Sequence, residues 1–188
     1  MRIYLETDRL LLRQFTRDDV DNLYELNSDP EVMRYLIGGP TPRAKIRDEI
    51  IPFHLGRYEE SDEFGTWAAQ ARSTGEFLGW FHFRSTEGSG IDLGYRLRRA
   101  AWNKGYATEG SRALIRKGFA DLGVPRVFAR TMTVNAASRH VLEKSGLVLV
   151  RTLAWDSEDT VEGSEQGEVE YALSRADWEQ RSAEATQR

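Results

Sequence analysis

The chain has 188 residues, 40% of them hydrophobic and 30% charged, which suits one soluble domain with a full hydrophobic core. The formal net charge of −4 argues against general nucleic-acid binding, and the absence of cysteine excludes disulfides, zinc–thiolate sites and a cysteine nucleophile. The charged opening segment is not a signal peptide, and no apolar stretch reaches the ~18 residues that cross a membrane. We therefore expect a cytoplasmic protein with neither nucleic acid nor membrane as a partner.

The first third of the chain is predicted to form one strand followed by helices. Residues 10–15 are a short apolar run typical of a strand. Thr16, with an acid three residues later, is an N-cap for a helix that ends near Asn27. A short turn follows Asp29-Pro30, and another helix begins at Thr41-Pro42. Pro52 should kink or divide that helix, whose inward residues are expected to be Ile46, Ile50 and Phe53.

The middle of the chain is predicted to contain three consecutive strands. They are expected at 66–71, 76–84 and 91–97, with turns at 73–75 and 88–90. The third has two faces, because apolar and polar residues alternate along it. One face carries Ile91, Leu93, Tyr95 and Leu97, and the other carries Asp92, Gly94 and Arg96.

The last part of the chain alternates helices and strands. Helices are expected at 108–122 and 135–144, and strands at 126–133, 147–155 and 169–173. Consecutive strands followed by a single strand–helix–strand–helix unit predict an α+β fold with local hairpins, not a doubly wound one. We expect one domain over residues 1–180, a flexible tail over 181–188, and an acidic loop over 156–168.

The segment 98–107 joins the third middle strand to a helix and is a candidate anion site. The free N–H groups of a first helical turn favour an anion, Gly105 and Ala107 permit close backbone approach, and Lys104 adds positive charge. On these grounds alone, a plain loop before an amphipathic helix is equally compatible. Neither GxxxxGK[ST] nor GxGxxG occurs, which argues against a nucleotide triphosphatase or a dinucleotide enzyme.

The segment 135–146 is a second candidate. Asn135 and Ser138 are three residues apart, on one face at the start of a predicted helix. By itself, this spacing favours an ordinary N-cap at Asn135.

Taken together, these segments resemble the GNAT superfamily of N-acetyltransferases, and within it the branch that includes the ribosomal-protein N-terminal acetyltransferases RimJ and RimL. The loop 102–109, Trp-Asn-Lys-Gly-Tyr-Ala-Thr-Glu, is similar to the WGKGYATEA loop of that branch, and 135–146 to its NxxSxxxxEKxG helix. Residues 6–13, 91–95 and 171–173 resemble its opening, central and closing strands. The resemblance implies the GNAT fold, a mostly antiparallel, splayed mixed sheet flanked by helices.

The resemblance also implies acetyl-CoA as acyl-donor substrate, with no metal. The pyrophosphate would be held by main-chain N–H groups of the loop, and the pantetheine arm by free main-chain groups of the splayed strand. Asn135 would bind the coenzyme arm, and Ser138 would lie near the sulfur. The implied coenzyme-binding residues are Tyr95, Leu97, Trp102, Asn103, Lys104, Gly105, Tyr106, Ala107, Thr108, Asn135 and Ser138.

Four positions depart from the pattern of the branch. Trp102 replaces a polar residue, so its side chain makes no phosphate contact, and Asn103 replaces a usual glycine, which makes backbone approach harder. Asp92 stands where the branch usually has Glu, and Arg96 where an aromatic residue is frequent.

Acetylation of an amine requires a base, because an alkyl ammonium with a pKa near ~10 is not a nucleophile. The candidates are Asp92, His82 and, more remotely, Glu109. Alternatively, Asp92 only binds a cationic substrate and His82 is a half-buried strand residue. Ser138 is the expected acid for the departing thiolate, whereas His140 should face away and His54 is expected to be structural.

The acceptor side is less defined by the sequence. Tyr24, Trp67 and Trp80 are candidate acceptor-pocket residues, although each is equally compatible with an aromatic core. We expect N-acetylation of a primary amine, either a protein N-terminus or a small molecule. There are two alternatives: transfer from a bulkier acyl-CoA such as succinyl-CoA, or a non-catalytic acyl-CoA sensor. The sequence is also compatible with a homodimer.

Overall fold

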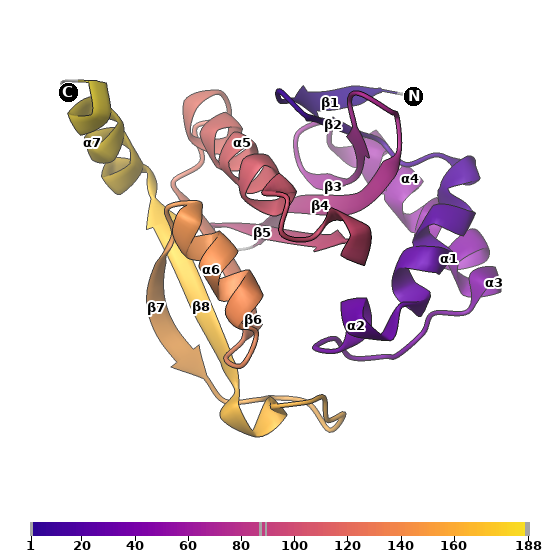
Figure 1. Ribbon diagram of the computed structural model, residues 1–188. Coiled ribbons are helices and arrows are strands. Elements are labelled where there is room, and N and C mark those ends of the chain that lie inside the picture. The colour runs from indigo at the N-terminus through magenta and orange to yellow at the C-terminus, as the bar shows by residue number, and fades with distance from the viewer. Residues whose placement is uncertain (1, 87, 89, 187–188) are drawn as a thin grey trace.

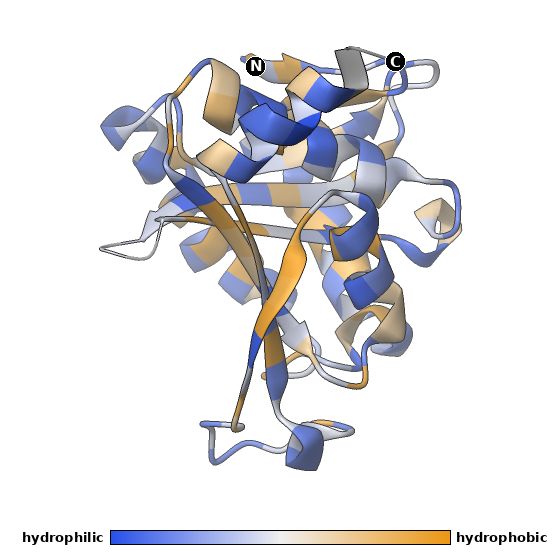
Figure 2. Cartoon of the chain, turned by 90° about the vertical axis from the view of Figure 1, so that its left-hand side faces the viewer, coloured by the Kyte–Doolittle hydropathy of each residue, from blue (hydrophilic) through white to orange (hydrophobic). Residues whose placement is uncertain are grey.

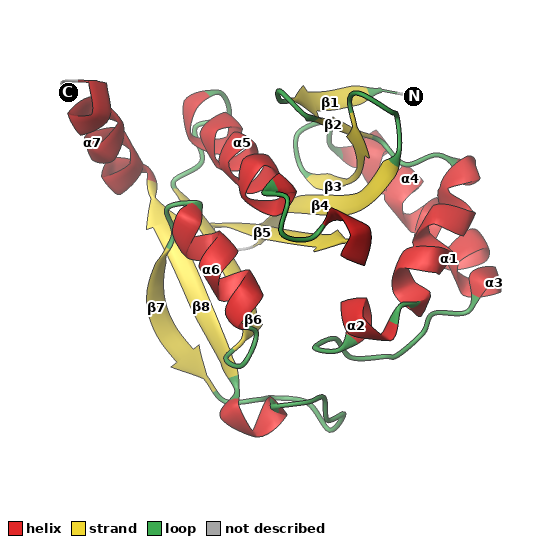
Figure 3. Ribbon diagram, in the orientation of Figure 1, coloured by secondary structure: helices red, strands yellow, loops and turns green. Residues whose placement is uncertain are grey.

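The computed structural model describes residues 2–86, 88 and 90–186. Within that part of the chain, eight strands form one mixed sheet in the order β1-β2-β3-β4-β5-β6-β8-β7, with helices on both faces (Figures 1 and 3). The strands are β1 Ile3–Glu6, β2 Leu10–Arg13, β3 Gly65–Ala71, β4 Phe77–Thr86, β5 Gly90–Leu97, β6 Arg126–Met132, β7 Val148–Leu153 and β8 Glu168–Ser174. The helices are α1 Val20–Ser28, α2 Pro30–Met33, α3 Arg43–Lys45, α4 Ile51–Glu60, α5 Tyr106–Ala120, α6 Ala136–Lys144 and α7 Arg175–Thr186. The predicted α+β architecture is confirmed.

The two faces of the sheet bury two separate sets of side chains, because neighbouring residues of a strand point to opposite faces. Trp67 of β3 and Phe81 of β4 belong to the larger core on the α5 face. Gly110 of α5 lets this helix approach closely, since a Cβ there would lie 2.4 Å from the Phe81 ring. Ala68 and Trp80 face the other way, toward the smaller core of α1 and α4. The sheet thus separates an α5–α6 side from an α1–α4 side.

The sheet opens between its two central strands. Strands β5 and β6 are parallel and pair only at Ile91↔Val127 and Asp92↔Phe128 in the described chain. Beyond Asp92, β5 continues to Leu97 along β4 alone, while β6 diverges toward β8 (Figure 1). The later residues of β5 therefore have one edge without strand pairing.

Two details differ from the expectations. Residues 3–6 form an additional edge strand, β1, which was not predicted from its mixed polar sequence. Phe53 was expected to face inward and is 61% exposed. A π-helical segment over Ile46–Ile50 is the reason, because its wider turn shifts the faces of α4 relative to Ile46. This segment also divides the helix just before Pro52, in line with the predicted break.

The end of the chain is also more regular than expected. Helix α7 runs through residue 186, so most of the predicted tail 181–188 is helical, and residues 187–188 lie outside the described part. At the edge of the sheet, Val148, Leu149 and Val150 of β7 are each about half exposed and form the apolar strand at the front of Figure 2. Among the described helices, none has the length and apolar character needed to cross a membrane.

Candidate active site

The N-terminus of α5 is open for an anion. The helix begins at Tyr106, two residues earlier than expected, and Gly105 is its N-cap with φ +81°. No side chain caps this end, so no capping side chain accepts a hydrogen bond from the N–H groups of the first turn. Asn103 also has a positive φ of 57°, a conformation that Asn adopts more readily than most residues. The loop therefore has left-handed backbone conformations at Asn103 and Gly105, which turn the chain sharply just before α5.

Arg9, in the β1–β2 turn, contacts this loop and holds it in place. Arg9 was not identified as a candidate site residue from the sequence. Its Nη1 donates to the Lys104 carbonyl oxygen at 2.8 Å, and its guanidinium lies 4.8 Å from the centre of the Tyr106 ring. Its Nε donates to Glu109 Oε2 at 2.6 Å, and the hydroxyl of Thr7 also binds that carboxylate. The Glu109 carboxylate is therefore engaged in hydrogen bonds with Arg9 and Thr7 that hold the loop, which argues against Glu109 as the more remote candidate for the base.

The other end of the loop is tied to β5. The indole Nε1 of Trp102 donates to the Leu97 carbonyl oxygen at 2.8 Å. The Leu97 carbonyl, one of the main-chain groups expected to bind the pantetheine arm, therefore already accepts a hydrogen bond. The predicted pantetheine contacts are thus limited to residues of β5 that precede Leu97. The Trp102 side chain thus has a structural contact at this point.

Across the opening of the sheet, Tyr95 of β5 reaches α6. Its hydroxyl lies 3.1 Å from Ser138 Oγ and 3.2 Å from the Ser138 carbonyl oxygen. Burial raises the pKa of Tyr95 to about 12, so the phenol stays protonated and can donate. Asn135 Oδ1 accepts from the Ser138 N–H at 3.1 Å, which makes Asn135 the N-cap of α6 and leaves its amide NH2 for another acceptor. The sequence placed Tyr95 and Ser138 at the site separately and did not show that their side chains meet.

On the opposite face of the same strands lies a His–Asp–Arg cluster. His82 Nε2 is 3.1 Å from Asp92 Oδ2, and Arg84 Nη2 is 3.5 Å from that oxygen and 3.0 Å from His82 Nδ1. The imidazole occupies the space left by Gly94, where a Cβ would lie 2.4 Å from the His82 ring. The two candidate bases are thus one connected pair.

The environment sets the protonation of this pair. Burial lowers the pKa of His82, against the opposing effect of Asp92, so the imidazole is neutral at pH 7. Burial alone would raise the pKa of Asp92, but the hydrogen bond from His82 and the nearby arginines outweigh it and lower that pKa. A neutral imidazole beside an ionised carboxylate can accept a proton and be stabilised once charged.

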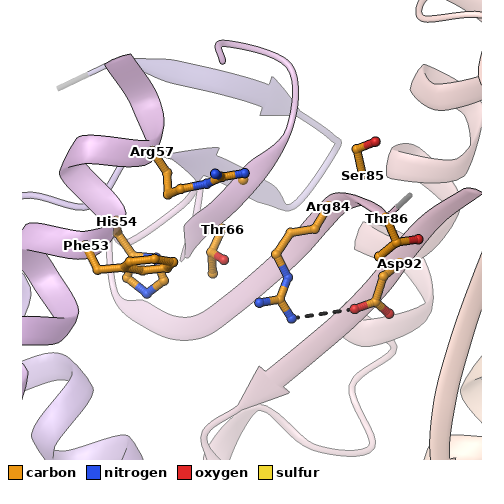
Figure 4. Close-up of a pocket in the computed structure, with 9 residues that line it drawn as sticks. Phe53, His54, Arg57, Thr66, Arg84, Ser85, Thr86 and Asp92 are labelled. Atoms are coloured by element: carbon orange, nitrogen blue, oxygen red, sulfur yellow. Dashed lines mark ion pairs between the residues drawn. The ribbon is translucent and has the colours of Figure 1, made fainter. Parts of the chain in front are cut away.

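A cavity of about 260 Å³ adjoins Asp92 on the α4 side (Figure 4). The Arg84 guanidinium points across it toward Asp92, while Phe53 and His54 of α4 form the opposite wall. His54 stacks on Phe15 with ring centroids 5.1 Å apart, and burial lowers its pKa to about 4. The full lining is Phe53, His54, Arg57, Gly65, Thr66, Arg84, Ser85, Thr86 and Asp92.

The three aromatic residues predicted for the acceptor pocket have different positions. Trp67 is 2% exposed and stacks on Tyr4 at 3.7 Å on the α5 side, so its assignment to the acceptor pocket was wrong. Alternation along β3 places it in the core. Trp80 is half-buried on the same face as His82, with the Arg96 guanidinium 5.1 Å from its ring centre. Tyr24 of α1 is 42% exposed.

Known proteins are similar to this chain in sequence and in fold. Residues 9–148 match the family model described as an acetyltransferase (GNAT) domain. The chain is 33% identical over 186 residues to FsC-acetyl coenzyme A-N(2)-transacetylase of Aspergillus fumigatus, which covers 93% of this chain and 77% of that protein. Structures with the same fold include RimL, the ribosomal L7/L12 alpha-N-protein acetyltransferase in complex with coenzyme A (TM-score 0.78, 16% identity, covering 92% of this chain and 98% of that one). Another is spermidine N-acetyltransferase from Vibrio cholerae with CoA and spermine (TM-score 0.75, 15% identity, 92% and 99% covered). This chain therefore belongs to the GNAT acetyltransferase family and is an acyltransferase.

Proposed function

We propose that this protein transfers the acetyl group of acetyl-CoA to a primary amine, which attacks directly in a ternary complex. One observation carries the proposal: the sheet opens immediately after Asp92, and β5 leads from that point to the uncapped N-terminus of α5. The anion-binding end and the proton-accepting pair are thus joined by one strand with a free edge. The three relatives described above have names that specify transfer to nitrogen, which supports the same acceptor chemistry.

The donor would lie along that strand. The backbone N–H groups of 103–108 hold the pyrophosphate, with Lys104 and Arg9 adding positive charge. The pantetheine arm pairs with the free edge of β5 like an added strand, and the amide NH2 of Asn135 binds its far side. Such an arrangement fixes the thioester near Gly94 and Tyr95, between the two faces of the sheet.

His82 and Asp92 would then prepare the amine. Asp92 attracts the ammonium, and the neutral imidazole of His82 takes its proton directly or through a water molecule. The nitrogen lone pair attacks the thioester carbonyl, and a β5 backbone N–H stabilises the oxyanion. Collapse of this intermediate expels the thiolate and forms the amide, with the second nitrogen proton released to solvent water.

Tyr95 and Ser138 would receive the thiolate on the other face. The thiol has an ordinary pKa of ~8.5, so its anion is a poor leaving group unless it gains a proton or a hydrogen bond. Ser138 Oγ gives this proton and is resupplied through the Tyr95 hydroxyl 3.1 Å away, which in turn takes a proton from solvent water. The base and the acid thus act from opposite faces of β5, and neither blocks the other.

The same geometry and the relatives support our proposal for the acceptor. We assign the chain to the RimJ/RimL-like branch on its loop and late-helix motifs, with RimL among the structures of the same fold. The acceptor is a protein N-terminus or a small-molecule amine that approaches from the α1–α4 face. Residues 1–180 act as a single catalytic domain.

The test is thiol release from acetyl-CoA in the presence of a panel of amines, with CoA affinity measured by calorimetry. Stoichiometric thiol release and N-acetylated product would support the proposal. Tight CoA binding without turnover of any amine would contradict it and indicate a sensor, whereas faster turnover of succinyl-CoA would contradict the acetyl donor. An Asp92→Asn variant with normal turnover would remove Asp92 from the proton-transfer step.

A further inference from the structure

Arg96 is a half-buried arginine on the α1–α4 face of β5, and no carboxylate of the described chain pairs with it. Its Nη1 donates to Asn27 Oδ1 at 2.6 Å. Its Nε is closed off from solvent and has no acceptor among the described residues. The arginines before and after it on this face have carboxylates: Arg84 is 3.5 Å from Asp92, and Arg98 is 2.8 Å from Glu25.

Such an arrangement is costly for the fold. A guanidinium removed from water loses hydration, and a neutral amide compensates for less of that loss than a carboxylate would. Burial lowers the pKa of Arg96 to about 10, which reflects this missing compensation. Aspartate has nearly the shape of asparagine, so a carboxylate at position 27 would neutralise the charge within the chain. The positive charge is instead left for a group outside the chain.

We propose that Arg96 binds a carboxylate of the amine acceptor, so that the enzyme prefers amino acids over simple amines. This inference rests on the proposed function, because it names the acceptor class for the same reaction. The carboxylate would bind at Nη2, because Asn27 occupies Nη1, Nε is closed off from solvent, and Nη2 has no hydrogen-bond partner among the described residues.

The strand register places Arg96 beside the proton-accepting pair. Trp80 pairs with Arg96, and His82 pairs with Gly94, so the two positions are one step, ~7 Å, apart along the strands. The centre of the Trp80 ring lies 5.1 Å from the guanidinium of Arg96 and 5.7 Å from the His82 ring centre, so it is a neighbour of both. The charge of Arg96 is also close enough to lower the pKa of His82.

Two opposite charges thus flank the acceptor position. Asp92 attracts the ammonium at one end, and Arg96 attracts the carboxylate at the other, which fixes the direction in which an amino acid binds. The strand positions of His82, which takes the proton of the ammonium, and Arg96 are ~7 Å apart, a distance of about five bonds of ~1.5 Å, which suits an amine at the far end of a short chain. The predicted acceptor is therefore an ω-amino acid or the side-chain amine of a basic amino acid.

The kinetic experiment compares 5-aminopentanoate with 5-aminopentanamide, which differ only in the carboxylate. We expect kcat/KM to favour the acid by about 10-fold or more in the wild type, because the acid alone forms charge-assisted hydrogen bonds. Asn27→Asp should bring the ratio near one by neutralising Arg96 internally, and Arg96→Met should do the same. Arg43→Met, which removes an exposed arginine paired with Asp21, is the matched control and should keep the wild-type ratio.

A binding experiment separates this inference from the proposed function. Calorimetry with saturating CoA measures the affinity for the acid and for the amide without any need for turnover. Equal affinities, or no measurable affinity for the acid, would overturn the role of Arg96. Selective binding of the acid without acetylation would instead overturn the proposed function and leave the carboxylate site in place.

A stability measurement excludes a purely structural role. Arg96→Met removes an uncompensated charge and can still pack on Trp80, so the thermal midpoint should not fall. A clear drop in the midpoint together with an unchanged acid-to-amide ratio would overturn the proposal.

Discussion

His82 Nε2 lies 3.1 Å from Asp92 Oδ2 across the β4–β5 pairing. The two residues are diagonal neighbours, since His82 is opposite Gly94 and Asp92 is opposite Arg84. The absence of a side chain at Gly94 gives the imidazole room to turn toward Asp92. The proposed base and the carboxylate beside it are thereby held on two paired strands, at the point where the sheet opens.

Replacing His82 by Gln should lower kcat/KM by about 100-fold or more, in the range usual for loss of a general base. CoA affinity should be unchanged, because the loop 98–107, the proposed pyrophosphate site, lies at the other end of β5. Steady-state kinetics and calorimetry measure the two quantities. His140→Gln, at an exposed position on α6, is the control, and equal activity of both variants would exclude His82 as the base.

Gly94→Ala should reduce activity while both polar residues stay in place. The new Cβ would lie 2.4 Å from the His82 ring, so the imidazole must move away from Asp92. We expect kcat to fall by about 10-fold or more, since small misplacements of reacting groups are costly. Gly56→Ala, in open space on α4, should be neutral. A crystal structure with an undisturbed His82–Asp92 contact would refute this account.

His54→Phe should make the protein more resistant to acid. The pKa of His54 is about 4 in the fold and ~6.5 in the unfolded chain, so only the unfolded state takes up the proton between these values. The free energy of unfolding therefore declines by up to ~3 kcal/mol as pH falls from about 6.5 to 4, and is unaffected above that window. Urea denaturation at pH 7 and pH 4.5 should show a smaller decline in the variant. An equal decline in both proteins would place the acid sensitivity elsewhere.

Gly105→Val should weaken CoA binding by about 10-fold or more. Its φ of +81° is unfavourable for a β-branched residue, so the loop must change shape and its N–H groups lose their common direction. Calorimetry with CoA measures the effect. Gly123→Val, with φ +65° near the other end of α5, imposes similar strain away from the loop. Equal affinity in the Gly105 and Gly123 variants would mean that the pyrophosphate site is misplaced.

Tyr95→Phe and Ser138→Ala should each slow thiol departure, and the double variant should be little worse than the slower single one. The two hydroxyls are 3.1 Å apart and would act as one proton path, so their effects should not add. Single-turnover measurement of thiol release is the appropriate assay. Fully additive losses would show that the residues act independently.

The sequence determined much of the fold, because its strongest patterns are local. The alternation from Ile91 to Leu97 assigned the two faces of β5, and the helical spacing after Gly105 assigned α5. The order of the loop and the late helix was enough to indicate the family. These features depend on residues close together in the chain, which periodicity and capping rules describe directly.

Tertiary structure decided the contacts on which the mechanism depends. Trp67 could not be assigned to the core from its own segment, since burial depends on which face α5 covers. Tyr95 contacts Ser138, and Arg9 contacts the loop 98–107. Both contacts join residues that are far apart in the sequence. No role for Arg96 was evident from the sequence. Its role is inferred from the lack of a carboxylate partner and of an acceptor for Nε among the described residues, and this can be seen only when the neighbouring side chains are known.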